Sequence, residues 1–185
     1  MKLKLLMGTV LSLMVVLSVQ AQRPVKHPVA KKKMIQHQQA KAIHQSNMAQ
    51  AIHVIKRTNK VILVAHNQVK KNKVYTGDLA KAVHHQRYAK KLLAMHKAHR
   101  AIQHSRLARM YAFQAIKQNK GMVSKEMQFN DEESKAMGEN ISDAELDKEL
   151  KDNDPTVSYD DKTITDKDMS DLDVLEMDES DYKNE

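Results

Sequence analysis

The spacing of apolar residues predicts a long helix in the first half of the chain. Between residues 34 and 73 there is neither Gly nor Pro, and apolar residues recur at steps of three and four. This spacing is typical of an amphipathic helix with one coiled-coil-like seam. The run at 61–65 (VILVA) is apolar all round, so a short strand is the local alternative. The predicted seam consists of Met48, Ile52, Ile55, Asn59, Ile62, His66 and Val69.

A second helical segment is expected at residues 79–117, again without Gly or Pro. Gly77 permits a tight turn before it, and Asp78 is expected to accept hydrogen bonds from the free N–H groups of its first turn. Gly121 suits the left-handed residue that closes a helix. Small residues recur at helical spacing within the segment and would let a neighbouring helix approach closely. They are Ala101, Ser105, Ala108, Ala112 and Ala115.

These patterns predict an all-α fold, with a long antiparallel helical hairpin over residues 34–120. Each helix would have roughly 40 residues and span about 60 Å. A break at residues 57–59 or 96–98 would instead divide the same pattern into three or four shorter helices. Aromatic residues are few in this region, so we also expect self-association into a homo-oligomer.

The N-terminus has the features of a secretory signal peptide. Lys2 and Lys4 precede an uncharged apolar run at 5–19, and Ala21 is the small residue that a signal peptidase requires. We expect cleavage between Ala21 and Gln22 and export of the mature chain, to the periplasm or into the medium. The alternative is an uncleaved anchor, but an apolar run of fifteen residues is shorter than the about 20 that span a bilayer.

Charge divides the mature chain in two. Residues 22–125 contain 23 basic residues and a single acidic one, Asp78, for a net charge of +22. Residues 126–185 contain 6 basic and 22 acidic residues, for a net charge of −16. An asymmetry on this scale indicates an interaction tail or the binding of a polyanion. The two halves are therefore potential ligands for each other.

Three parts are expected within the mature chain. A flexible basic arm at 22–33 contains two prolines, which should prevent a helix there. The basic helical domain at 34–120 follows. The acidic tail at 121–185 is expected to be mostly disordered, since its composition cannot bury enough apolar surface to fold alone. A capping-box pattern that starts at Ser142 predicts one or two helical turns within this tail.

The residue inventory argues against catalysis. There is no Cys, which removes disulfides and thiolate metal sites. The basic half has one carboxylate, so a paired-carboxylate mechanism has no place there. The sequence has no Gly-rich phosphate loop, no nucleophile elbow and no HExxH helix. We therefore expect a non-enzymatic protein without a cofactor, apart from the metal ions considered next.

Ten histidines make metal binding the main alternative. His96 and His99 are spaced i, i+3, and His85 lies about three turns earlier on the same face of a continuous helix. Together they would bind Zn, Ni or Cu, and the chain would then be a periplasmic metal-binding or stress-sensing protein. The simpler interpretation is that these histidines are surface residues, because no carboxylate lies near enough in the sequence to complete the site.

The positive charge of the helices predicts an anionic partner. Export leaves an anionic envelope polymer, lipid headgroups or an acidic protein as candidates and disfavours nucleic acid. The chain's own acidic tail is expected to compete for the same surface or to keep the protein soluble. The leading hypothesis is thus an exported helical binding protein that engages an anionic envelope component or client. The predicted contact residues are Lys31, Lys32, Lys33, Arg57, Lys60, Lys70, Lys71, Lys90, Lys91, Arg100, Arg106 and Arg109.

Residues 77–117 resemble a tetratricopeptide-type helical hairpin. The segment 77–82 (GDLAKA) looks like the start of one helix of such a unit, and residues 92–108 look like the turn and second helix of another. The resemblance implies a pair of packed helices that binds a protein or peptide. The inter-helix glycine and terminal proline of the repeat are missing, and one copy cannot form a solenoid. In general plan the chain also resembles small exported helical proteins of Gram-negative bacteria.

Overall fold

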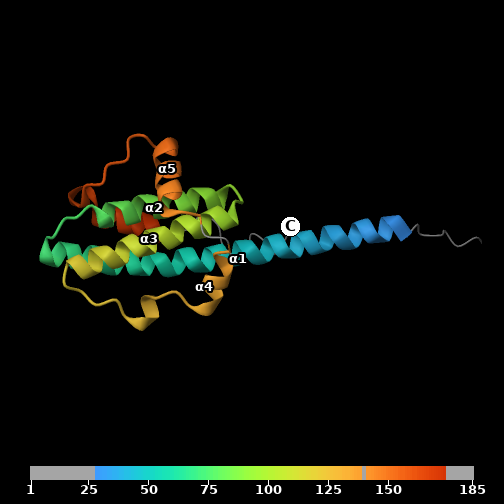
Figure 1. Ribbon diagram of the computed structural model, residues 1–185, viewed down its shortest axis with the longest axis horizontal. Coiled ribbons are helices and arrows are strands. Elements are labelled where there is room, and N and C mark those ends of the chain that lie inside the picture. Colours follow the sequence, from blue (N-terminus) through green and yellow to red (C-terminus); the bar gives the residue numbers. More distant parts are fainter. Residues whose placement is uncertain (1–27, 139–140, 174–185) are drawn as a thin grey trace, which may run out of the picture. The chain divides into compact units, whose positions relative to one another are not determined.

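The structure is a computed structural model that describes residues 28–138 and 141–173, and it confirms the prediction of an all-α fold for these ranges (Figure 1). The chain divides after His37 into two units, and the account below concerns the second. In chain order the helices are α1 (Pro28–Asn72), α2 (Asp78–Ala94), α3 (Ala98–Gln118), η1 (Lys125–Met127), α4 (Asp131–Ala136), α5 (Asp143–Asn153), η2 (Asp161–Thr163) and α6 (Asp166–Asp173).

The predicted signal peptide and its cleavage site at Ala21 and Gln22 lie outside the described residues. The prediction that the arm at 22–33 is not helical is wrong from Pro28 onward, where α1 begins. A proline fits the first turn of a helix because the N–H that it lacks has no partner there. Along the described part of the chain, no helix is both long enough and apolar enough to cross a membrane.

Helices α1, α2 and α3 form a three-helix bundle, because the second predicted helix is divided at residues 95–97 (Figure 1). His96 has a φ of 57°, in the left-handed region. Its N–H donates to the carbonyl of Leu93 at 2.8 Å, and the N–H of Lys97 donates to the carbonyl of Leu92 at 2.9 Å. These two bonds form a Schellman motif that ends α2. The predicted break at 96–98 is confirmed, and the one at 57–59 is wrong because α1 continues through it.

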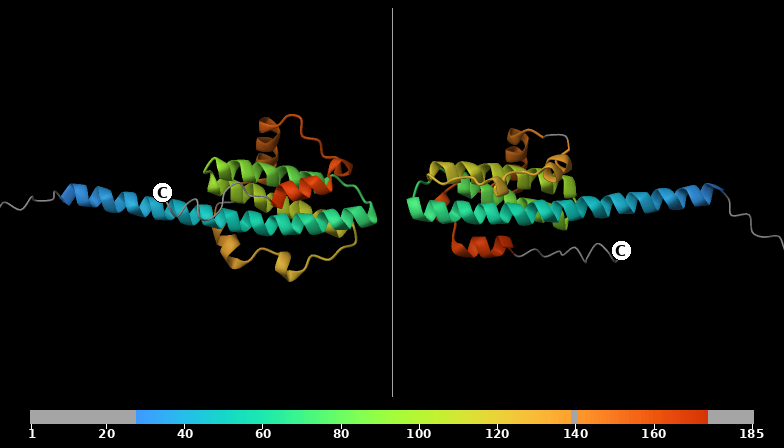
Figure 2. Two further views of the ribbon diagram at one scale, coloured as in Figure 1. Left: turned by 180° about the vertical axis from the view of Figure 1, so that it is seen from behind. Right: turned by 90° about the horizontal axis from the view of Figure 1, so that it is seen from below.

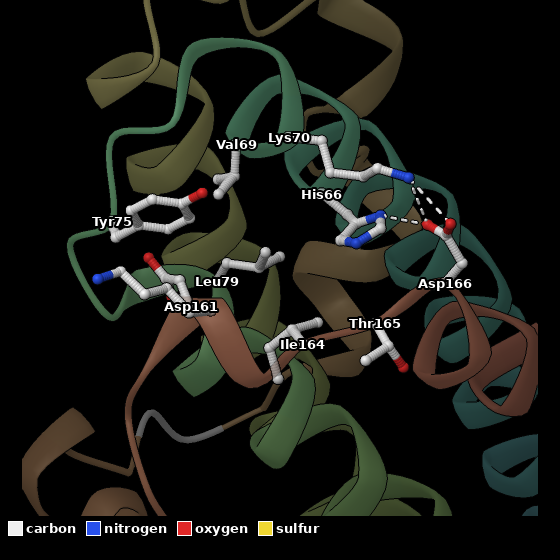
Figure 3. A pocket seen from close by; sticks show the side chains of 10 residues that line it. His66, Val69, Lys70, Tyr75, Leu79, Asp161, Ile164, Thr165 and Asp166 are labelled. Atoms are coloured by element: carbon white, nitrogen blue, oxygen red, sulfur yellow. Dashed lines mark hydrogen bonds and ion pairs between the residues drawn. The ribbon is translucent and has the colours of Figure 1, made fainter.

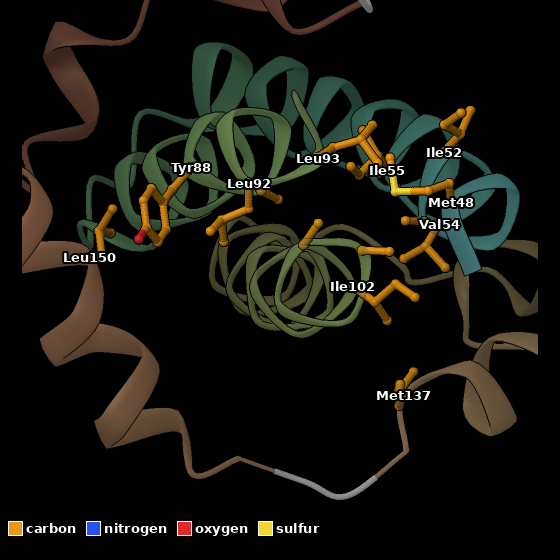
Figure 4. Packing of buried hydrophobic residues seen from close by; sticks show 14 residues of the cluster. Met48, Ile52, Val54, Ile55, Tyr88, Leu92, Leu93, Ile102, Met137 and Leu150 are labelled. Atoms are coloured by element: carbon orange, nitrogen blue, oxygen red, sulfur yellow. The ribbon is translucent and has the colours of Figure 1, made fainter. Parts of the chain in front are cut away.

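The predicted seam of α1 lies in the core of this bundle. All seven of its residues are buried, including Asn59 and His66, and the strand alternative at 61–65 is wrong. The small residues of α3 are buried as well, which lets α1 approach closely enough for the hydroxyl of Thr58 to lie 3.5 Å from the carbonyl oxygen of Ser105. Figure 4 shows side chains of the three helices converging on one cluster.

Two lysines, and not a glycine, take the left-handed positions at the ends of α1 and α3. Lys73 has a φ of 57° and Lys120 a φ of 56°. The prediction that Gly121 takes this position is wrong, because Gly121 is the following residue, whose N–H donates to the carbonyl of Ile116 at 2.8 Å. A Cβ at Gly121 would lie 2.8 Å from the Ile116 side chain, so close packing explains this glycine.

The start of α2 is capped by a residue far away in the sequence. Gly77 adopts the left-handed conformation, with a φ of 85°, as a tight turn requires. The carboxylate of Asp161 in η2 accepts hydrogen bonds at 2.8 Å from the N–H groups of Thr76, Gly77 and Ala80. Asp78 instead accepts a hydrogen bond from the Thr76 hydroxyl, so the prediction that Asp78 caps this helix is wrong.

The acidic segment, which we define as residues 126–173, folds onto the bundle. The prediction of a mostly disordered tail is wrong for its described residues, since they form α4, α5 and α6, and α5 confirms the helix predicted after Ser142. The segment folds because its few apolar side chains are buried against the bundle. The bundle provides the apolar surface that the segment does not have by itself. Figures 1 and 2 show the three helices on different sides of the bundle. The buried apolar residues of the segment are Met137, Leu146, Leu150, Met169 and Leu172.

Candidate functional site

Besides the Asp161 cap on α2, the helices α4, α5 and α6 of the acidic segment contact the basic helices at three docking points. Helix α4 contacts α1 and α3, α5 contacts α2 and α3, and α6 contacts α1 and α2. Each pair of bundle helices is therefore bridged by one acidic helix. We call these contacts together the basic–acidic interface, and its central carboxylates are Glu133, Asp147, Asp166 and Asp168.

The first docking point is a buried cluster around Glu133, whose side chain is 1% exposed. Arg109 of α3 donates to its two carboxylate oxygens at 2.8 and 3.0 Å, and Arg57 of α1 donates to one of them at 2.5 Å. Arg109 is fully buried and also donates to the hydroxyl of Thr58 and the carbonyl of Val54. A buried ion pair of this kind is stable only when its remaining hydrogen-bonding groups are satisfied, as they are here.

The local sequence explains how α4 presents Glu133. Asn130 and Glu133 form a capping box, in which the Asn130 side chain accepts from the N–H of Glu133 at 2.8 Å and the carboxylate accepts from the N–H of Asn130 at 3.1 Å. The ring of Phe129 lies 4.6 Å from the guanidinium carbon of Arg109. Burial alone would raise the pKa of Glu133, but the hydrogen bonds and charge of Arg109 outweigh burial and lower it.

The second docking point joins Asp147 of α5 to a buried histidine pair. The Nε2 atom of His85 lies 2.9 Å from a carboxylate oxygen of Asp147, and the Tyr111 hydroxyl donates to both oxygens at 2.9 and 3.1 Å. The Nδ1 atoms of His85 and His104 are 3.0 Å apart, so one ring donates and the other accepts. The Nε2 atom of His104 is buried without a hydrogen bond, 3.6 Å from a carboxylate oxygen of Glu149.

Burial sets the protonation of His104. Desolvation, followed by the neighbouring His85, lowers the pKa of His104 to about 3, so this ring is neutral at physiological pH. The hydrogen bond from His85 lowers the pKa of Asp147 although burial opposes it. Burial and the adjacent Asp147 raise the pKa of Tyr111. The second docking point therefore combines an ionised Asp147 carboxylate with the protonated hydroxyl of Tyr111 and a neutral His104.

The third docking point holds α6 between α1 and α2. Arg87 donates to Asp168, and Lys70 donates to both oxygens of Asp166 at 2.8 and 2.9 Å. His66 and Lys70 both point toward Asp166 (Figure 3). The Nδ1 atom of His66 lies 3.7 Å from a carboxylate oxygen of Asp166. His66, Lys70 and Asp166 border an open cavity of about 330 Å³.

The backbone at the end of α6 is also anchored. The Asn59 side chain donates to the carbonyl of Leu172 at 2.5 Å, and the Lys90 ammonium donates to the carbonyl of Asp171 at 2.6 Å. The Met169 and Leu172 side chains are buried against the bundle. Cations of the basic helices therefore bind both side chains and backbone of the acidic segment.

Half of the cations predicted to bind a polyanion are held by the acidic segment. Arg100 lies 3.4 Å from Glu145 and Arg106 is paired with Asp143, in addition to the contacts above. The prediction that Arg109 contacts a partner is wrong, because its side chain is fully buried. The side chains of residues 31–33 lie outside those described, and Lys60, Lys71 and Lys91 are exposed. The cations held are Arg57, Lys70, Lys90, Arg100, Arg106 and Arg109.

The three histidines of the predicted metal site are separated. His85 is buried in α2, His96 lies in the turn after α2, and His99 is in the first turn of α3. His96 and His99 do not share a helix, because the chain reverses between them. Among the described side chains, no group of three or more His, Asp or Glu is arranged to hold a metal ion.

The residues that matter most at the interface were not singled out in the sequence. Glu133, Asp161 and His104 are anchors whose partners lie at least 19 residues away along the chain. The Asn130–Glu133 capping box was a visible signal that would have located α4. Nothing in the spacing indicates that Asp161 caps α2.

No family model, no curated protein and no solved structure matches this chain. The function must therefore be inferred from the geometry of the basic–acidic interface.

Proposed function

We propose that the chain is a non-enzymatic exported helical binding protein. Its basic surface engages an anionic envelope component or client, and its acidic segment is the intramolecular competitor for part of that surface. The observation that supports this proposal is that carboxylates and carbonyls of the acidic segment bind cations of all three bundle helices. An anionic ligand would use the same charge-assisted contacts.

The three docking points differ in how readily they open. At the first, Arg109 and Glu133 are buried, and at the second, Asp147 meets a fully buried His85. At the third, the carboxylate of Asp166 is 75% exposed, and Arg87 is 40% exposed. Exposed ion pairs contribute little to stability, whereas buried ones are costly to break. Helix α6 is therefore the part of the competitor that an external anion displaces most easily.

The test measures the binding of polyphosphate, a soluble anionic polymer. It uses a variant in which the ion pairs between α6 and the bundle are weakened. The variant D166N/D168N removes two carboxylates that bind Lys70 and Arg87. We expect it to bind polyphosphate more tightly than the wild type, with a steeper loss of affinity as salt increases, because more cations release counterions.

The matched control is E132Q/D152N, which removes two negative charges from exposed positions of the acidic segment that form no ion pair among the described residues. It tests whether net charge alone explains the gain. Equal polyphosphate affinities of the two variants would contradict competition by α6, and absence of binding by all three proteins would contradict the proposed function itself.

A further inference from the structure

One end of the bundle carries cations that form no ion pair with the described part of the acidic segment. The last turns of α1 and α3 lie side by side there, and each ends in an Asn-Lys pair, Asn72-Lys73 and Asn119-Lys120. We define the basic end by the ammonium groups of Lys71, Lys73, Lys117 and Lys120, all of which are exposed.

Hydrogen bonds tie the two helix ends together. The Asn72 side chain donates to the carbonyl of Asn119 at 2.8 Å. Asn119 is fully buried, and its side chain both accepts from the N–H of Val74 at 3.1 Å and donates to the carbonyl of Val74 at 2.9 Å. The backbone positions of Lys73 and Lys120 are therefore fixed relative to each other by the fold.

The backbone conformation of these two lysines is unusual. Both Lys73 and Lys120 are left-handed, a conformation that is common at helix ends but is usually adopted there by Gly and sometimes by Asn. A lysine there complements the partial negative charge of the helix terminus. Lysine occupies this left-handed position at both adjacent helix ends. The fold therefore has two cations at positions where an uncharged Gly or Asn would also fit.

The nearby carboxylates are already engaged. Asp161 is buried and accepts three backbone N–H bonds at the start of α2, and Asp166 is paired with Lys70. Asp78 accepts a hydrogen bond from the Thr76 hydroxyl. Among the described residues, no carboxylate forms an ion pair with any of the four lysines of the basic end.

Exposed apolar side chains accompany these lysines. Val74 is 39% exposed and Tyr75 is 44% exposed in the turn after α1, and Met122 is 88% exposed in the turn after α3. The Lys162 ammonium lies 5.4 Å from the centre of the Tyr75 ring and adds a further cation. A hydrophilic polyanion gains nothing from exposed Val and Met, whereas a lipid interface binds apolar and aromatic side chains beside lysines.

We propose that the basic end binds the surface of a lipid bilayer that contains anionic headgroups. This inference rests on the proposed function, because it names the surface and the partner class for anion binding. The lysines meet the headgroup phosphates, and Val74, Tyr75 and Met122 enter the interfacial layer. The contact is peripheral, and it leaves the three docking points of the acidic segment intact.

The test measures binding of the chain from Gln22 onward to vesicles by co-sedimentation. Starting at Gln22 removes the apolar run at 5–19, which would itself insert into lipid, and removes none of the described residues. The vesicles are phosphatidylcholine with or without phosphatidylglycerol. The wild type should bind when phosphatidylglycerol is present, and K71Q/K73Q/K117Q/K120Q should bind at least about tenfold more weakly, since each lysine near an anionic surface contributes to binding.

The matched control, K56Q/K60Q/K91Q/K97Q, removes four exposed lysines from other parts of the bundle and makes the same change in net charge. It should retain most of the binding. Equal losses in the two variants would overturn the basic end as the site while leaving anion binding in place. A circular dichroism spectrum like that of the wild type excludes unfolding as the cause of a loss.

A second variant separates the lipid surface from other phosphates. Y75S/M122S keeps every lysine, so it should bind polyphosphate as the wild type does and phosphatidylglycerol vesicles more weakly. Unchanged vesicle binding by this variant would overturn the lipid proposal. Binding of the wild type to polyphosphate but not to vesicles would also overturn it, whereas binding to neither would contradict the proposed function.

Discussion

Arg109 and Glu133 form a bidentate ion pair in which the two side chains are 0% and 1% exposed. Arg109 belongs to the basic half of the chain and Glu133 to the acidic half. The two oppositely charged halves of the chain are therefore joined by an ion pair that is as deeply buried as the apolar core. This contact makes the acidic segment part of the fold.

We predict that E133Q lowers the free energy of unfolding by about 3 kcal/mol, because it leaves the buried Arg109 without its counter-charge. The measurement is urea unfolding followed by circular dichroism. Glu132, the exposed neighbour of Glu133 in α4, provides the control E132Q, which should shift the midpoint little. If both variants unfold at the same urea concentration as the wild type, the pair does not hold α4 in place.

Capping of α2 from a distance gives a second prediction. D161A should lower the free energy of unfolding by about 1–2 kcal/mol, the usual cost of losing a helix cap. It leaves the N–H groups of Thr76, Gly77 and Ala80 without their acceptor.

The control for this prediction is D78A, at the position that the sequence favoured as the cap. Among the described residues Asp78 accepts one side-chain hydrogen bond, from Thr76, so D78A should cost less than D161A. The reverse order in thermal or urea unfolding would show that Asp78 is the functional cap.

The buried histidine pair predicts that stability falls in mild acid. Burial lowers the pKa of His104 to about 3 in the folded chain, whereas an unfolded histidine titrates near 6.5. The unfolded state therefore takes up a proton first as pH decreases, and the stability that His104 contributes is lost progressively below pH 6.5. Between pH 7 and pH 5 this loss is about 2 kcal/mol. Burial also lowers the pKa of His66 and of His84, which add to the loss in the same direction.

The measurement is urea unfolding at several pH values for the wild type, H104Q and H53Q. His104 is buried and His53 is exposed, so H104Q should have a shallower pH dependence than the wild type and H53Q the same one. Identical slopes for H104Q and the wild type would refute the assignment of this pH dependence to His104.

Sequence patterns predicted the helices of the bundle well, because helical periodicity depends on residues that are close together in the sequence. The seam from Met48 to Val69 and the small residues of α3 repeat with the period of a helix, and the structure buries them as expected. The break at His96 was one of two considered, since nothing in the sequence requires a left-handed residue there. The separation of His85, His96 and His99 shows that spacing along the sequence alone does not place a metal site.

The folding of the acidic segment could not be predicted because its stabilising contacts are not local. Leu150 and Leu172 are isolated apolar residues among carboxylates, a composition that predicts disorder. They become buried only on the surface that the basic helices provide. Composition describes a segment by itself and cannot report a partner elsewhere in the same chain.

This dependence gives a prediction for the core. L150A and L172A remove buried side chains of α5 and α6, and each should lower the free energy of unfolding of the whole chain by about 2–3 kcal/mol. Circular dichroism and tyrosine fluorescence should give coincident transitions, because one cooperative unit unfolds. A first transition that changes the fluorescence and removes only a minor part of the helical signal would indicate that the acidic helices unfold separately.

Native-state hydrogen exchange tests most directly whether the acidic segment is part of the fold. Amides of α5 and α6 should be protected together with those of α2 and α3, and the four helices should lose protection at similar urea concentrations. Exchange of α5 and α6 at the rates of an unfolded peptide, while α2 and α3 stay protected, would contradict this account.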